Sequence, residues 1–256
     1  MSNTVALLNQ KGGVGKTTVT LGLASAAAAA GHRVLVVDLD PQASATWLLG
    51  IDPDAVGLST ADVLASTDVL ATTAAEAIVD SAWGDGIHLL PASPDLQARD
   101  SGTPSRLRTA LAAVAGDYHA ILIDCPPSLG NLTTSALTAA DHALIVVEPS
   151  ALGLRGIGAV ARVIDDVWSA HNGDLELSGV IVNRVPGVST EADRRIDELA
   201  QIVGKKTIWK PAIPQRVLLN QAVGERRPIH SYGARSADVS QAFDALWAKL
   251  RRTIIR

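Results

Sequence analysis

Residues 10–18 read QKGGVGKTT, and this glycine-rich stretch decides the fold. It follows an apolar run at residues 4–9 and precedes an alanine-rich run at residues 16–30. The first run has the composition of a buried strand and the second that of a helix. Glycines between a strand and a helix let the backbone approach an anion, and the unpaired N–H groups of the first helical turn point at it. The stretch therefore predicts a phosphate-binding loop.

The rest of the chain repeats this alternation of strand and helix. Runs rich in β-branched residues predict further strands at residues 33–39, 87–90, 120–124, 143–147 and 178–183. Helical patterns predict helices at residues 106–115, 132–139, 156–170, 191–203 and 236–252. Continuous apolar strands between helices are typical of an α/β fold with a mostly parallel, twisted sheet covered on both faces. We expect a single domain over residues 1–256, with residues 53–83 as loosely placed helices.

Composition narrows the class of protein. Apolar residues make up 47% of the chain and charged residues 19%, which is typical of a folded globular protein. Cys125 is the one cysteine, so an internal disulfide is excluded and a reducing compartment is expected. The first residues have no basic region followed by a long apolar one, and no run approaches the roughly 20 apolar residues of a membrane span. We therefore expect a cytoplasmic protein.

Charge is distributed unevenly along the chain. Residues 205–256 hold 11 of the 22 Lys and Arg residues but only 3 of the 26 Asp and Glu residues. An acidic body with a basic C-terminal segment predicts a face that meets a polyanion. The alternative is that these charges are scattered over the folded surface.

The glycine loop carries two lysines. Lys16 is placed to reach the β- and γ-phosphates of a nucleotide, and the hydroxyl of Thr17 can ligate Mg²⁺. The remaining candidate phosphate-binding residues of the loop are Gly12, Gly13, Val14, Gly15 and Thr18. The common pattern has a glycine where this chain has Gln10, and Lys11 is an additional cation.

Aspartates follow two of the predicted strands. Asp38 and Asp40 lie at the end of the second strand, and Asp124 ends the strand at residues 120–124. The carboxyl ends of parallel strands are where open α/β sheets bind ligands. The alternative reading of the first pair is turn-forming aspartates before Pro41. Cys125 has no histidine placed to activate it, so we interpret it as a small buried side chain.

These motifs together resemble the ParA/MinD superfamily of deviant-Walker ATPases. The segments KGGVGKT, DLDPQAS, DCPPSLG and IPQRVLLNQAVGERRPI occur in the order of that family and cover nearly the whole chain. The resemblance is greatest to ParA-type partition proteins. It implies a P-loop NTPase fold and a weak ATPase with ATP and Mg²⁺ as cofactors.

The resemblance also implies roles for individual residues. Lys11 would be the family's second lysine, which crosses a dimer interface to the partner's nucleotide, much as an arginine finger acts in trans. Asp40 would position the attacking water, while Asp38 and Asp124 would help Thr17 hold the magnesium shell. In the base pocket, Asn183 would read adenine through its amide and Pro214 would pack on the base.

The biological role implied is DNA partition. An ATP-bound homodimer would bind double-stranded DNA non-specifically on the nucleoid, and a centromere-binding ParB-like adaptor would stimulate hydrolysis and release it. Many relatives carry arginines where this chain has Gln215 and Leu218. We therefore expect phosphate contacts, without base reading, from the remaining arginines of the segment: Arg216, Arg226, Arg227 and Arg235.

Two other functions remain as alternatives. A MinD-like ATPase acting at a membrane surface needs an amphipathic C-terminal helix, and the tail has apolar residues at positions 243, 246, 247, 250 and 254. The same spacing describes an ordinary helix packed on the sheet. The DLDPQAS segment favours partition, so we expect no stable membrane association. A cluster-carrying relative of nitrogenase reductase would need paired cysteines, which this chain lacks.

Overall fold

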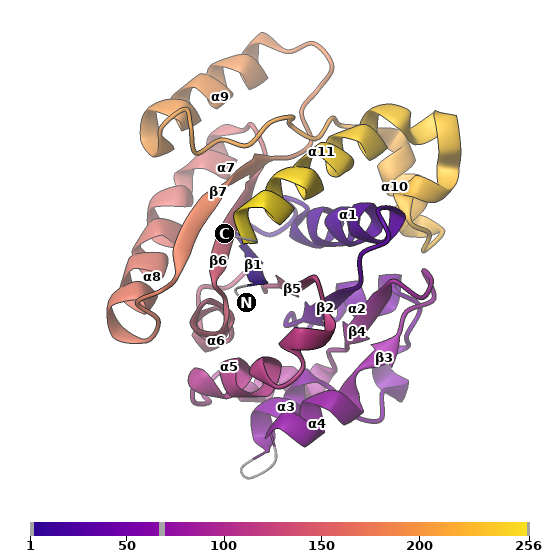
Figure 1. The fold of residues 1–256 in the computed structure, drawn as a ribbon. Coiled ribbons are helices and arrows are strands. Elements are labelled where there is room, and N and C mark those ends of the chain that lie inside the picture. The colour runs from indigo at the N-terminus through magenta and orange to yellow at the C-terminus, as the bar shows by residue number, and fades with distance from the viewer. Residues whose placement is uncertain (1–2, 67–69, 255–256) are drawn as a thin grey trace.

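The computed structural model describes residues 3–66 and 70–254 and contains a seven-stranded sheet (Figure 1). The strands are β1 (Thr4–Leu8), β2 (Val34–Asp38), β3 (Val79–Asp80), β4 (Ile87–Leu90), β5 (Ala120–Asp124), β6 (His142–Val147) and β7 (Glu176–Val182). They lie in the order β3-β4-β2-β5-β1-β6-β7. Every neighbouring pair is parallel except β3 with β4. The predicted mostly parallel sheet is confirmed.

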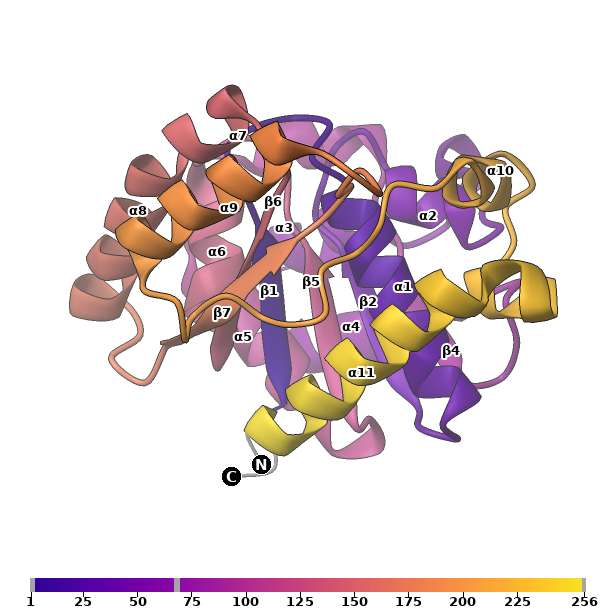
Figure 2. The same ribbon diagram turned by 90° about the horizontal axis from the view of Figure 1, so that it is seen from above.

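Helices cover both faces of this sheet (Figure 2). One layer contains α1 (Lys16–Ala29), α2 (Ser44–Leu48), α10 (Val217–Gly224) and α11 (Ala237–Ile254). The other contains α3 (Thr60–Ala65), α4 (Leu70–Ala77), α5 (Ser105–Ala112), α6 (Asn131–Ala139), α7 (Ala151–Arg155), α8 (Ile157–Ala170) and α9 (Thr190–Val203). Short 3₁₀ helices lie at Pro53–Ala55, Pro94–Arg99, Ala115–Asp117 and Ile229–Ser236.

The central strands are apolar along most of their length because each of their faces meets a helical layer. In β1, Val5 and Leu7 pack in the core on the α1 side, whereas Ala6 and Leu8 pack in the core on the α6 side. All four side chains are fully buried. Side chains of a strand alternate between its faces, so a strand buried on both sides needs an apolar residue at every position.

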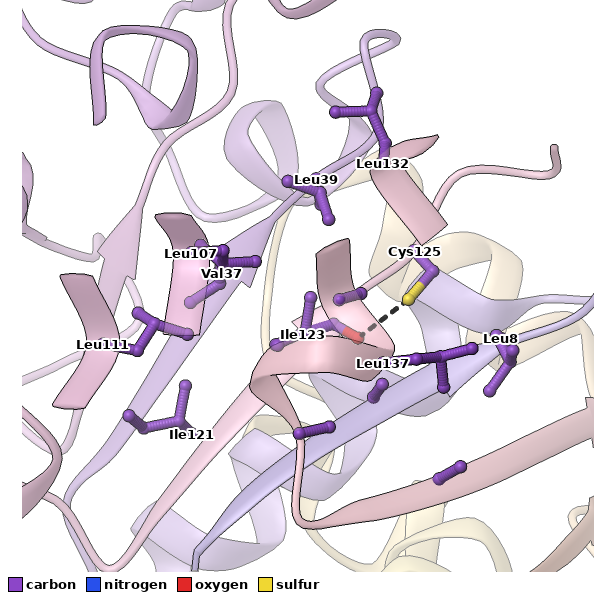
Figure 3. Packing of buried hydrophobic residues seen from close by; sticks show 14 of the residues in the cluster. Leu8, Val37, Leu39, Leu107, Leu111, Ile121, Ile123, Cys125, Leu132 and Leu137 are labelled. Atoms are coloured by element: carbon purple, nitrogen blue, oxygen red, sulfur yellow. Dashed lines mark hydrogen bonds between the residues drawn. The ribbon is translucent and has the colours of Figure 1, made fainter. Parts of the chain in front are cut away.

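The core on the α6 side includes Cys125 (Figure 3). Its thiol lies among Leu8, Leu132 and Leu137 and points towards the carbonyl oxygen of Ile123 at 3.9 Å. Burial raises the pKa of this thiol far above its ordinary value. The interpretation of Cys125 as a small buried side chain is confirmed.

The last helix, α11, packs along α1. At Gly22 of α1, an added Cβ would lie 2.2 Å from the ring of Phe243, so only glycine lets the two helices approach this closely. The apolar residues of the tail at positions 243, 246, 247, 250 and 254 are all buried. They form part of the core and present no free apolar face to a membrane. No described helix has both the length and the apolar character needed to cross a bilayer.

The structure differs from the sequence predictions mainly in short elements. Residues 53–83 contain α3 and α4 as expected, but also the edge strand β3. Neither α2 nor α10 is predictable from the sequence, because helices of five and eight residues show too little periodicity. Residues 67–69 of the first region and residues 255–256 of the basic segment lie outside the described residues.

Candidate functional site

The glycine loop joins β1 to α1, as the sequence predicts. Gly13 and Gly15 have positive φ angles of 81° and 87°, and Gly15 is the N-cap residue of α1. A Cβ at Gly15 would lie 2.4 Å from the amide nitrogen of Asn183. Glycine is therefore required there both by the backbone conformation and by the side chain opposite. The loop delivers the unpaired N–H groups of α1 to a cleft.

This cleft has a volume of about 420 Å³ and is lined by residues from several motifs. The lining residues are Gly12, Gly13, Gly15, Lys16, Thr17, Thr18, Asp40, Gln42, Ser44, Trp47, Leu48, Pro127, Arg184 and Val223. The loop, the segment after β2 and the segment after β5 thus meet at one edge of the sheet. A glycine-rich wall with one buried lysine fits the phosphates of a nucleotide.

Asp124 connects β5 to the first turns of α1. Its carboxylate accepts hydrogen bonds from the hydroxyls of Thr17 at 2.6 Å and Thr20 at 3.2 Å. Burial raises the pKa of Asp124 to about 6, although the hydrogen bond from Thr17 and the charge of Lys16 oppose the rise. Thr20 was not identified from the sequence, because a threonine inside a helix carries no distinctive signal.

Asp38 lies beside Asp124, since β2 and β5 are paired with these two residues in register. Its carboxylate accepts hydrogen bonds from the backbone and hydroxyl groups of Thr46, both at 2.8 Å, and from the backbone of Asp40 at 3.1 Å. Burial raises the pKa of Asp38 to about 7, and the neighbouring Asp124 adds to the rise. Thr46, which no sequence motif marks, therefore ties α2 to the end of β2.

The oxygen donors around Thr17 fit a magnesium ion that also takes phosphate oxygens and water. Within residues 3–66 and 70–254, no group of three or more His, Cys, Asp or Glu side chains is arranged to hold a metal by itself. Mg²⁺ usually keeps several waters and uses one or two protein oxygens together with substrate phosphates. The adjacent Thr17 hydroxyl and Asp124 carboxylate match that donor set. Asp38 is nearby but engaged with Thr46.

Lys11 lies apart from Lys16. Its ammonium group pairs with Glu148 and also approaches the hydroxyl of Ser150, at 3.5 Å. Glu148 follows β6 and Ser150 caps α7. Burial alone would raise the pKa of Glu148, but hydrogen bonds from Lys11 and Ser150 outweigh it and the pKa is lowered. Neither acceptor was identified from the sequence.

A second pocket, of about 470 Å³, adjoins the phosphate cleft and shares Thr18, Arg184 and Val223 with it. Asn183 lines this pocket and donates its amide N–H to the carbonyl of Val14 at 2.8 Å. The amide oxygen of Asn183 is buried and has no hydrogen-bond partner in the described structure. Pro214 forms an isolated β-bridge with Val185. The next residue in the chain, Gln215, lines the pocket.

The four candidate DNA-binding arginines lie around α10 and the 3₁₀ helix that follows. Arg216 forms an ion pair with Asp238 at 2.6 Å. Arg227 and Arg235 both lie over the ring of Tyr232. Arg226 turns the other way and stacks on Trp47 of α2. The structure therefore brings these arginines to one end of the molecule, near the cleft, but gives each a different partner.

Comparisons with known proteins agree with this geometry. Residues 2–177 match the family described as an AAA domain. The chain is 35% identical over 243 residues to the sporulation initiation inhibitor protein Soj of Bacillus subtilis, a match that covers 92% of this chain and 93% of Soj. It is 37% identical over 221 residues to the chromosome-partitioning ATPase Soj of Thermus thermophilus, covering 85% and 83% of the two chains. Among solved structures, cobyrinic acid a,c-diamide synthase from Mycobacterium smegmatis, with a bound ATP analogue and magnesium, matches with a TM-score of 0.84 and 32% identity over 98% of this chain and 95% of that one.

Proposed function

This chain belongs to the ParA/Soj family of partition ATPases, and from that membership we propose that ATP closes two copies into a dimer that binds double-stranded DNA non-specifically. The protein is an ATPase that uses ATP and Mg²⁺. In the proposed cycle, a centromere-binding ParB-like adaptor stimulates hydrolysis and the dimer leaves the nucleoid. The observation that carries the dimer is the position of Lys11.

Lys11 does not contribute to the phosphate-binding cleft of its own subunit. It is not among the residues that line the cleft, where Lys16 already supplies a cation, and its ammonium is held by Glu148 at the end of β6. Its side chain is 29% exposed, so it can exchange this partner for another anion. In the proposed dimer, Lys11 reaches the phosphates of the partner's nucleotide and adds positive charge there. ATP is then both the substrate and part of the dimer interface.

The residues of the cleft have separate roles in the proposed hydrolysis. The loop N–H groups and Lys16 hold the phosphates, and Thr17 with Asp124 holds Mg²⁺, which neutralises charge on the phosphate oxygens. Asp40 lines the cleft without being buried, and we assign it the positioning of the attacking water. Asp38 supports this arrangement by fixing Thr46 and the backbone of Asp40.

Adenine recognition is assigned to Asn183. One N–H of its amide donates to Val14, which fixes the orientation of the amide and leaves the carbonyl oxygen, an acceptor with no partner in the described structure, to be assigned to a base. Adenine presents an amino group as a donor, whereas guanine has an acceptor at the same position. The orientation of the amide therefore supports ATP over GTP, and Pro214 is proposed to support the base from the adjoining segment.

DNA binding is assigned to Arg216, Arg226, Arg227 and Arg235. Contacts of this kind go to phosphates, so affinity should fall steeply with salt and show no sequence preference. The membrane alternative needs a free apolar face on α11, and the structure buries that face against α1. We therefore propose no stable membrane association.

The test combines size-exclusion chromatography with DNA retention, each with and without ATP and Mg²⁺. Wild-type protein is expected to form a dimer and retain DNA only with ATP. Lys11→Ala is expected to bind ATP as a monomer but to lose both the dimer and DNA retention, while Arg162→Ala, at an exposed position of α8 outside the basic segment, serves as the matched control. ATP-dependent dimerisation of Lys11→Ala at the wild-type concentration would refute the role of Lys11. Binding to liposomes instead of DNA would overturn the partition proposal.

A further inference from the structure

Trp47 has no role in the function described so far, yet it lies where two functional regions meet. It belongs to α2, the short helix that follows Asp40, and it lines the phosphate cleft. The preceding residue, Thr46, makes two hydrogen bonds to the carboxylate of Asp38. The position of Trp47 is therefore tied to the acidic residues of the cleft. Nevertheless 44% of its side chain is exposed, which is unusual for a large aromatic residue.

Arg226 occupies an unusual backbone conformation at the end of α10. Its φ angle is +53°, in the left-handed region where glycine is usual. Its N–H bonds to Val223 at 3.1 Å, and the next N–H, of Arg227, bonds to Ala222 at 3.0 Å. These two bonds define a Schellman motif with an arginine in the glycine position. Strained residues of this kind persist only where the surroundings fix them.

Two tryptophans fix Arg226. The centre of its guanidinium group lies 4.9 Å from the centroid of the Trp47 ring. The indole N–H of Trp83 donates to the carbonyl oxygen of Arg226 at 2.9 Å. Both the side chain and the backbone of this arginine are thus held by residues outside the basic segment. Figure 2 shows α2 and α10 at the same end of the molecule.

The other candidate arginines are held within the C-terminal region itself. Arg216 pairs with Asp238, while Arg227 and Arg235 lie over Tyr232. In the described structure, the guanidinium of Arg226 lies over an aromatic ring of α2, the helix that follows the Asp40 motif, whereas the rings and carboxylate that hold the other three belong to the C-terminal region. A movement of α2 would therefore displace Arg226 directly and the others only through the segment.

We propose that Trp47 is a positioning residue for Arg226 and transmits the arrangement of the nucleotide cleft to the DNA-binding segment. A guanidinium group stacked on an indole face keeps its N–H donors at its edge, where they can bind a phosphate. Displacement of α2 removes this support and changes the direction of the donors. The inference depends on the proposed DNA binding and adds the route by which ATP controls it.

The experiment measures DNA affinity at saturating ATP and Mg²⁺ and at fixed salt, so that differences in ATP affinity do not enter. Trp47→Leu removes the aromatic face but keeps an apolar side chain, and DNA affinity is expected to fall roughly threefold to tenfold. The slope of log affinity against log salt is expected to fall by about one, as for the loss of one phosphate contact. Trp47→Phe keeps a ring and is expected to retain most of the affinity. Trp168→Leu, at an exposed tryptophan on α8, is the control and should bind DNA like the wild type.

The decisive comparison is between the single variants and the double variant with Arg226→Ala. If Trp47 acts through Arg226, the double variant loses no more affinity than Arg226→Ala alone. Independent, multiplying losses would overturn the inference, as would equal losses in Trp47→Phe and Trp47→Leu. If the wild type binds DNA with ATP while Trp47→Leu is unaffected, only this inference fails. If the wild type does not bind DNA at all, the proposed function fails with it.

Discussion

In the nucleotide cleft, functional side chains sit at the ends of strands and at the start of a helix, whereas the arginines of the basic segment depend on other side chains for their positions. Lys16, Thr17 and Asp124 are placed by β1, α1 and β5. Arg216 and Arg226 are placed by an aspartate and a tryptophan. Substitutions in the cleft should therefore remove a function outright, while substitutions in the segment should change its strength.

The largest effect is expected from Lys16→Ala. This lysine is only 7% exposed and lines the cleft, so its removal leaves the bound phosphates without their main buried cation. Loss of one partner of a buried charge pair costs about 2–5 kcal/mol, which weakens ATP binding by roughly 30-fold to several thousandfold. Titration calorimetry with ATP and Mg²⁺ measures this. An affinity close to that of the wild type would contradict the assignment of the cleft.

Asp40→Ala should separate binding from hydrolysis. The carboxylate of Asp40 lines the cleft and accepts a hydrogen bond from the backbone N–H of Gln42. It makes no such bond to the phosphate-binding loop in the described structure. ATP affinity should change little, whereas turnover should fall by about 100-fold or more if the carboxylate acts on the attacking water. The ATP dimer should then persist on a size-exclusion column. Turnover at the wild-type rate would exclude this role.

The buried carboxylates of the cleft should make the stability of the ligand-free protein depend on pH. The pKa of Asp38 is raised to about 7 and that of Asp124 to about 6, so the folded protein keeps protons that the unfolded chain has released. These two carboxyl groups therefore contribute to the free energy of unfolding in a pH-dependent way. Their stabilising contribution is complete below the ordinary pKa of an aspartate and is lost as pH rises through 6 to 7. His32 and His142 have lowered pKa values, so below pH ~6.5 the unfolded chain binds protons there that the folded protein does not. Their effect is to lower stability as pH falls, which opposes that of the two aspartates.

The informative range therefore lies above pH ~6.5, beyond the ordinary pKa of histidine. Urea unfolding should show stability falling by about 1 kcal/mol between pH ~6.5 and ~8. Asp38→Asn should flatten the profile. If the stability of the wild type instead rises over this range, Asp38 and Asp124 do not have the raised pKa values assigned to them.

The smallest effect is expected from Arg216→Ala. Arg216 is paired with Asp238, and both side chains are about half exposed, so much of its charge is already balanced. DNA affinity should fall less than about twofold. Asp238→Ala is the matched variant: it frees the arginine and should strengthen DNA binding, with a salt slope larger by about one. Filter binding at several salt concentrations measures both. A large loss in Arg216→Ala would show that the ion pair opens on DNA.

Short motifs in the sequence were sufficient to predict the phosphate loop, the parallel sheet and the aspartates at its edge. Gly13 and Gly15 show the reason, since a left-handed backbone next to a helix N-terminus is a local requirement that selects glycine directly. The continuous apolar runs likewise reflect burial on both faces of the strands, which the sequence records residue by residue.

Only the tertiary structure decided which side chains meet. The sheet order places β5 between β1 and β2, and this brings Asp124 beside Asp38. Lys11 pairs with Glu148, which is 137 residues away in the chain, and Arg226 stacks on Trp47 from the other end of the sequence. The sequence by itself determined which residues have the right chemistry and which strands carry them. It could not determine these pairs, because a contact between distant segments depends on strand order and helix packing, and no local pattern encodes either.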